Sequence, residues 1–129
     1  MGSRKVPDLA TIIRSAKIPV KVSCVVDAPN RCEIDRFLTE CHRIGVKRVV
    51  LRRLYGDTTP YTLLADCTPS RFFKNNPVYD LDGMEVTVWN FDDTTYRSLN
   101  LFADGTLGSN YLLTKTPEIL CRPVMMRQC

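Results

Sequence analysis

The hydrophobic pattern is clearest between residues 20 and 55, where it predicts a strand, a helix and a second strand. Residues 20–26 (VKVSCVV) are largely β-branched and apolar, which is typical of a strand buried on both faces. Residues 47–51 (KRVVL) begin a second run of this kind. Two buried strands joined by an amphipathic helix predict a right-handed βαβ crossover unit with parallel strands.

The helix between the two strands is predicted from apolar residues spaced three and four positions apart. This stripe consists of Ile34, Phe37, Leu38, Cys41 and Ile44. Asn30, with Glu33 three residues later, is predicted to cap the start of the helix, since the two side chains suit its unpaired N–H groups and positive end. Gly45 is predicted to end the helix in a left-handed conformation.

Two further stretches precede and follow this unit. Residues 8–16 predict a short helix that begins at Asp8 and has one apolar face, and we interpret it as the helix of a preceding βα unit. Residues 61–79 give no clear period. Thr68 as a cap, with Pro69 at the first helical position, indicates a helical turn in this stretch.

Three strand patterns follow, at residues 84–91, 96–103 and 106–113. The pair Asp104–Gly105 is typical of a two-residue type I′ turn, which would place Phe102 opposite Leu107. The strands therefore predict a three-stranded antiparallel meander over residues 84–113. The expected fold is one domain of the α+β or α/β class: residues 8–55 form a helix and the βαβ unit, the meander follows, and residues 114–129 form an irregular tail. One mixed sheet with one or two helices is expected.

Length and composition fit this picture. A chain of 129 residues is expected to form a single domain. No apolar run approaches the ~20 residues that cross a bilayer, and no signal-peptide core follows the first residues, so a cytoplasmic protein without a membrane partner is expected. The net charge of +4 is spread along the chain. The basic group at residues 47–53 lacks a recognition motif, which argues against a nucleic-acid partner.

Six cysteines are many for this length, and no two have C-x-x-C spacing. They are Cys24, Cys32, Cys41, Cys67, Cys121 and Cys129. Without signs of secretion we expect mostly reduced, structural thiols, with a disulfide or a metal site as the alternative. His42 is the single histidine, and no matched carboxylate or thiol accompanies it. We interpret it as a surface residue rather than a catalytic one.

The segment VKVSCVVDAPNRCEIDRFLTECHRIGVKRVVLRRL resembles a late βαβ unit of the partial TIM barrel of radical S-adenosylmethionine enzymes. In that family a V-K-[VI]-N-hydrophobic-V strand is followed by an Asn-x-x-Glu-Ile helix start and a Gly-Val turn into an Arg-rich strand. The later segment LNLFADGTLGSNYLLT is similar to sequences that follow the barrel in some members. The resemblance implies the C-terminal part of such a half-barrel.

The chain lacks the cysteine motif on which the family's chemistry depends. The family holds a [4Fe–4S] cluster with a C-x-x-x-C-x-x-C loop, and no three cysteines here have that spacing. The resemblance therefore implies a fragment or relic that is non-catalytic on its own. It implies no iron–sulfur cluster in this chain, and it suggests S-adenosylmethionine as a ligand.

Candidate ligand-binding residues lie where the predicted parallel strands end, because crevices form outside the carboxyl ends of such strands. Asp27 and Asn30 follow the first strand, and Arg52 and Tyr55 end the second. Arg52 could contact a carboxylate or phosphate with two hydrogen bonds. Ser23 stands where the family often has Asn. Together they predict a pocket for a small anion or nucleoside. The alternative is that Asn30 caps, Asp27 turns the chain and Arg52 is solvated.

Two functional hypotheses remain open at the level of the sequence. In the first, the chain is a half-barrel derived from an enzyme, which has lost or was cut from its catalytic half, and a second chain is the possible source of that half. In the second, the chain is a stand-alone binding or interaction module that forms a homo-oligomer through an exposed sheet edge. A small complete enzyme is the least favoured, since there is no Ser–His–Asp set, P-loop or GxGxxG loop.

Overall fold

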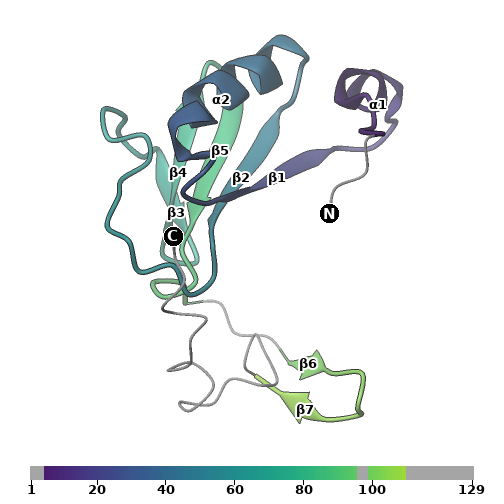
Figure 1. Ribbon diagram of the computed structural model, residues 1–129. Helices are drawn as coiled ribbons and strands as arrows, with labels where there is room; N and C mark the ends of the chain where they lie inside the picture. Colours follow the sequence, from purple (N-terminus) through teal and green to yellow (C-terminus); the bar gives the residue numbers. More distant parts are fainter. Residues whose placement is uncertain (1–4, 96–98, 110–129) are drawn as a thin grey trace. The chain divides into compact units, whose positions relative to one another are not determined.

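The computed structural model describes residues 5–95 and 99–109, and the chain divides into two compact units after Thr95. The N-terminal unit contains a five-stranded mixed sheet in the order β1-β2-β5-β4-β3, with helices α1 and α2 (Figure 1). Its elements are α1 (Leu9–Ser15), β1 (Lys21–Val26), the 3₁₀ turn η1 (Arg31–Glu33), α2 (Ile34–Arg43), β2 (Arg48–Arg53), β3 (Arg71–Phe73), β4 (Asn76–Leu81) and β5 (Met84–Trp89). This arrangement confirms the predicted mixed α+β class.

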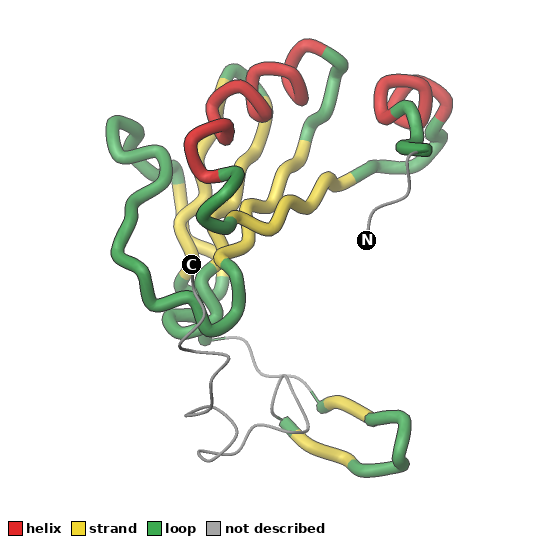
Figure 2. The backbone as a smooth tube through the Cα atoms, in the orientation of Figure 1, coloured by secondary structure: helices red, strands yellow, loops and turns green. Residues whose placement is uncertain are grey.

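The predicted βαβ unit is present. Strands β1 and β2 pair in parallel, with Val22 opposite Val49 and Cys24 opposite Leu51, and α2 connects them across one face of the sheet (Figure 2). The apolar stripe of α2 faces the sheet: its buried members are Ile34, Leu38 and Cys41. After the helix, Gly45 has a φ of 89°, as predicted for a left-handed terminating residue.

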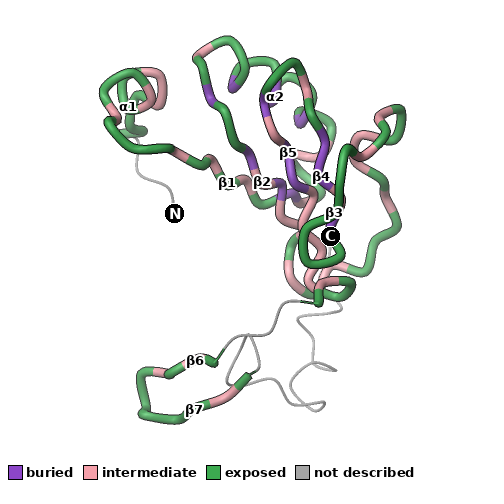
Figure 3. Tube along the Cα trace, turned by 180° about the vertical axis from the view of Figure 1, so that it is seen from behind, coloured by how far each residue is buried: buried purple, intermediate pink, exposed green. Residues whose placement is uncertain are grey.

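The prediction that β1 is buried on both faces is wrong. Exposed and less exposed residues alternate along the strand, so that Ser23 and Val25 are exposed whereas Val26 is fully buried (Figure 3). The cause is that the helix packs on one face only. The valine at position 25 therefore reflects the preference of β-branched residues for extended backbone and not a second buried layer.

The antiparallel strands lie earlier in the chain than predicted. Strand β5 pairs in parallel with β2 and antiparallel with β4, and β4 pairs antiparallel with β3. The predicted three-stranded meander over residues 84–113 is therefore wrong, since the antiparallel run of this sheet covers residues 71–89. Strand β3 also takes the place of the helical turn predicted at Thr68. Two-residue turns join these strands, Lys74–Asn75 and Asp82–Gly83. All four residues have positive φ, which is the signature of type I′ turns.

The core of this unit lies between α2 and one face of the sheet. The central strands contribute Val49, Leu51 and Val86, each at most 1% exposed. Helix α1 has no buried residue, but its Ile13 packs against the same core. Within the described residues, both helices therefore contact one face of the sheet. The opposite face presents residues of β1, β2 and β5 with no described helix over it.

The second unit contains a hairpin of β6 (Asn100–Leu101) and β7 (Leu107–Gly108), which forms a separate two-stranded sheet. Leu101 pairs with Leu107, and the Phe102 N–H donates to the Thr106 carbonyl at 2.9 Å. The hairpin around Asp104–Gly105 is confirmed, but the pairing of Phe102 with Leu107 is wrong because the connection is longer than two residues. The other parts of the predicted outer strands, and the tail with Cys121 and Cys129, lie outside the described residues.

Candidate functional site

The carboxyl ends of β1, β2 and β5 lie along one edge of the sheet, because these three strands are parallel. The loops that follow them begin at Asp27, Leu54 and Asn90. Every candidate residue except Ser23 lies at this edge or in these loops. Four of the five candidate residues therefore lie at the carboxyl-end edge of the sheet.

Arg52 and Tyr55 are brought together by an aromatic residue from the third parallel strand's loop. The guanidinium carbon of Arg52 lies 5.2 Å from the centroid of the Phe91 ring, and the Tyr55 ring meets Phe91 edge-on at 5.5 Å. Trp89 approaches the same ring at 6.3 Å. Such geometry gives a cation–π contact and favourable edge-to-face pairs. We name these four residues the aromatic cluster.

The aromatic cluster starts on the sheet face opposite α2. Arg52 pairs in register with exposed Val25 on one side and with Trp89 on the other. Its neighbour Leu51 is fully buried under the helix, and side chains alternate along a strand, so Arg52 faces away from the helix. Sequence reasoning missed Phe91 and Trp89 as site residues, because only the pairing of β5 with β2 brings them beside Arg52.

Asp27 and Asn30 form a closed turn of their own. The Asp27 N–H donates to Asn30 Oδ1 at 3.0 Å, the Asn30 N–H donates to Asp27 Oδ1 at 3.2 Å, and Asn30 Nδ2 donates to the Val25 carbonyl at 2.8 Å. The prediction that the Asn30 side chain caps the helix is therefore wrong, since the side chain bonds backward and η1 precedes α2. Both side chains have structural partners within the turn.

Ser23 lies apart from these groups. It is exposed on β1 and pairs in register with Val50, two positions before the Val25–Arg52 pair and on the same face. The five predicted residues thus occupy three places: the aromatic cluster, the closed turn at the end of β1, and an isolated position on the sheet face.

A second charged group lies on the other side of the sheet, at the ends of the same strands. The guanidinium carbons of Arg31 and Arg53 each lie 3.9 Å from the centroid of the Tyr61 ring. Asp57 Oδ2 is 3.6 Å from Arg31 Nη2. Arg53 donates to the carbonyls of Thr59 and Tyr61. We name Arg31, Arg53, Tyr61 and Asp57 the arginine–tyrosine cluster.

The arginine–tyrosine cluster is largely shielded from water. The side chain of Arg31 is 24% exposed and that of Asp57 14%. Hydrogen bonds from Thr59 hold the pKa of Asp57 below its ordinary value, and the charges of Arg31 and Arg53 act in the same direction. Burial raises the pKa of Tyr61. At neutral pH the cluster therefore combines two guanidinium cations, one carboxylate and a neutral phenol.

Sequence reasoning did not find this cluster. Arg53 belonged to the basic group at residues 47–53, but nothing in the local pattern connected it to Arg31 or Tyr61. The available signal was the alternation of side chains, which sends Arg52 and Arg53 to opposite faces of a strand. The position of Tyr61 beside Arg31 and Arg53 depends on the path of the irregular segment after β2, whose sequence has no hydrophobic period.

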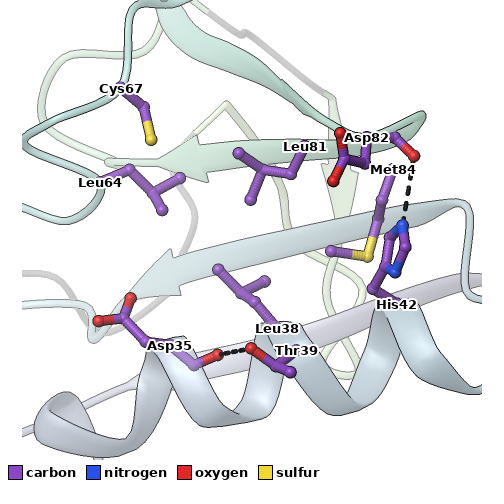
Figure 4. Close-up of a pocket in the computed structure, with 9 residues that line it drawn as sticks. All are labelled: Asp35, Leu38, Thr39, His42, Leu64, Cys67, Leu81, Asp82 and Met84. Atoms are coloured by element: carbon purple, nitrogen blue, oxygen red, sulfur yellow. Dashed lines mark hydrogen bonds between the residues drawn. The ribbon is translucent and has the colours of Figure 1, made fainter.

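A groove of about 370 Å³ lies between α2, the β4–β5 turn and the segment before β3 (Figure 4). Its floor includes the apolar side chains of Leu38 and Met84. His42 Nε2 lies 3.3 Å from the Asp82 carbonyl oxygen at one end, and Asp35 lines the other end. His42 thus contacts the turn between two strands, in line with its interpretation as an exposed surface residue.

The remaining candidate chemistry is limited. Cys24, Cys32, Cys41 and Cys67 are free thiols, and burial raises the pKa of Cys24 and Cys41. Within residues 5–95 and 99–109, no three His, Cys, Asp or Glu side chains gather in a way that could hold a metal ion. Over the same residues, none of the helices combines the length and apolar character that spanning a membrane requires.

The fold and the two clusters define an α+β protein whose parallel strands end in arginines and aromatic rings on both faces of a mixed sheet. No protein-family model, curated protein or solved structure matches the chain.

Proposed function

We propose that the chain is the C-terminal part of a radical S-adenosylmethionine-type half-barrel, that it is non-catalytic on its own, and that its aromatic cluster binds a small anionic or nucleoside ligand. In closed βα barrels the helices lie outside, and ligands bind at the carboxyl ends of the strands. Here β1, β2 and β5 are parallel, and the described helices contact only one face of their sheet. The opposite face corresponds to the inside of such a barrel.

The observation that carries the proposal is the position of Arg52. It stands near the carboxyl end of β2 on the face opposite α2, half-buried and stacked with Phe91. A guanidinium can bind a carboxylate or phosphate, and aromatic rings beside it can stack on a purine. S-adenosylmethionine carries both a carboxylate and an adenine, so its chemistry suits this combination.

The proposal gives this chain no part in reductive cleavage of S-adenosylmethionine, since its sequence contains no C-x-x-x-C-x-x-C motif. A second chain would supply the cluster-binding half of the barrel. It would add to the sheet next to β1, which is the edge strand on the parallel side.

The test is a thermal unfolding experiment with S-adenosylmethionine. A ligand at ~100 times its dissociation constant adds about 2.7 kcal/mol to the stability of the native state, which raises the midpoint by roughly 10 °C for a domain of this size. We expect Arg52→Gln to abolish most of this shift. The matched control is Arg48→Gln, which removes the same charge from the same face at the amino end of β2, beside Glu85.

Either of two results would reject the proposal. One is a midpoint that stays unchanged in excess S-adenosylmethionine and also in parallel experiments with adenosine and with methionine. The other is equal loss of the shift in Arg48→Gln and Arg52→Gln, which would indicate general attraction to basic charge and not a site at the strand ends.

A second candidate function is a stand-alone interaction module that forms a homo-oligomer. The observation in its favour is the edge strand β1, whose Val25 is 46% exposed and whose outer edge pairs with no described strand. Unpaired edges are templates for strand addition, and an added lysine blocks such pairing. Sedimentation equilibrium should then show a dimer that Val25→Lys converts to a monomer. A wild-type monomer at every concentration would reject this candidate.

A further inference from the structure

The arginine–tyrosine cluster is not used by the proposed function, because it lies on the helix side of the sheet whereas Arg52 faces the other side. Arg53 contributes to the cluster from the last position of β2, and Arg31 contributes from η1, just before α2. The two cations share one aromatic ring. Like charges held at one ring repel each other, so a counter-charge at this place lowers the free energy.

Part of this cluster has an evident structural role. Arg53 donates to two backbone carbonyls, those of Thr59 and Tyr61, and so fastens the segment after β2 to the end of the strand. Asp57 in turn accepts the Thr59 N–H at 2.9 Å. These contacts account for Arg53 and Asp57, and they do not account for Arg31.

Arg31 and Tyr61 have buried donors that no described residue pairs. Arg31 Nε and the Tyr61 hydroxyl are both inaccessible to solvent, and neither has a hydrogen-bond partner within residues 5–95 and 99–109. The approach of Asp57 to Arg31, at 3.6 Å, is an ion pair longer than a hydrogen bond. Buried donors left unpaired cost free energy, and they indicate a group that would accept from them.

Both carboxylates near the cluster already have partners of their own. Asp57 is the carboxylate that pairs with Arg31, and Asp27 acts on Tyr61 electrostatically from the end of β1. Asp27 is already the acceptor of the Asn30 N–H.

We propose that Arg31, Tyr61 and Arg53 bind a phosphate-class oxyanion, with Arg31 Nε and the Tyr61 hydroxyl as donors to its oxygens. Guanidinium groups match the geometry of phosphoryl oxygens and bind them with paired hydrogen bonds. The neutral phenol supplies an uncharged donor at neutral pH. The site lies across the sheet from the aromatic cluster and is independent of the half-barrel proposal.

The experiment is a calorimetric titration of the full chain with inorganic phosphate at constant ionic strength, with chloride as the balancing anion. A charge-assisted hydrogen bond lost at Arg31 should weaken the affinity of the Arg31→Gln variant roughly tenfold or more. Loss of the neutral donor in Tyr61→Phe should weaken it by about threefold to tenfold. The matched control is Arg36→Gln, which removes an equal charge from the exposed side of α2 and should leave the affinity unchanged.

A second measurement uses the wild-type chain and does not depend on the folding of variants. The Nε–Hε resonance of Arg31 should shift on addition of phosphate and saturate with the calorimetric dissociation constant. The proposal is overturned if phosphate produces no saturable heat and no shift of this resonance. It is also overturned if Arg36→Gln weakens binding as much as Arg31→Gln, which would indicate diffuse attraction only.

Discussion

Truncating two neighbouring valines of β1 tests whether one face of the sheet or both are packed. Val26 is fully buried, whereas Val25 is 46% exposed. Removing the two methyl groups of Val26 forfeits ~0.8 kcal/mol of transfer free energy for each, and a cavity adds to this, so Val26→Ala should cost about 2–3 kcal/mol. Val25→Ala loses about half of the transfer free energy and leaves no closed cavity, so it should cost less than about 1 kcal/mol.

The assay is urea unfolding followed by the fluorescence of Trp89, the single tryptophan, which is half-buried on β5. The variants should differ in midpoint while keeping the same slope, since both unfold the same surface. Equal destabilisation by the two substitutions would refute the reasoning. It would mean that the face opposite α2 is also covered, by a second copy or by another chain, and that Val25 is buried in that assembly.

Two further predictions concern the turns and the thiols. Gly83→Ala should destabilise the chain by about 1 kcal/mol in urea unfolding, because Gly83 has a φ of 81° in the two-residue turn before β5, where a side chain is strained. The control Gly108→Ala changes a glycine without positive φ and should have a smaller effect. Equal effects would contradict the turn assignment. Burial raises the pKa of the Cys41 thiol above its ordinary value of 9.0, so the thiol of the unfolded chain ionises first as the pH rises. The contribution of Cys41 to stability is therefore complete below pH 9.0 and is lost as the pH rises through the pKa of the folded state. Between about pH 8 and about pH 10 the urea midpoint should therefore fall further for the wild type than for Cys41→Ala. An equal fall in the two proteins would show that Cys41 does not contribute.

The elements with strong local periods were predictable. The stripe from Ile34 to Ile44 predicted α2 and its buried face, and Gly45 marked the helix end, because a helix is specified by residues that are near in sequence. The two runs around the helix predicted the parallel pair β1 and β2. The short helix at Asp8 was also found, and there the carboxylate accepts from the N–H groups of Ala10 and Thr11.

The errors arose where pairing depends on distant residues. Strand β5 alternates as predicted, but its own sequence does not determine whether it pairs with β6 or with β2. Its hairpin with β4 follows from the turn at Asp82–Gly83. That pair is a type I′ signature equal in kind to Asp104–Gly105, where the hairpin connection is in fact longer. Strand β3 is only Arg71–Phe73, too short for a period to be visible.

The candidate sites show the same division between local and distant information. Arg52 and Arg53 are adjacent in sequence, and alternation alone places them on opposite faces of β2. The aromatic partner of each arginine comes from another segment of the chain. Phe91, after the end of β5, contacts Arg52, and Tyr61, in the segment after β2, contacts Arg53. The basic group at residues 47–53 thus contributes arginines to two clusters on opposite faces of the sheet. Loss of one ligand on mutation of its arginine should therefore leave the other ligand bound, since the two arginines share no ring and face opposite layers.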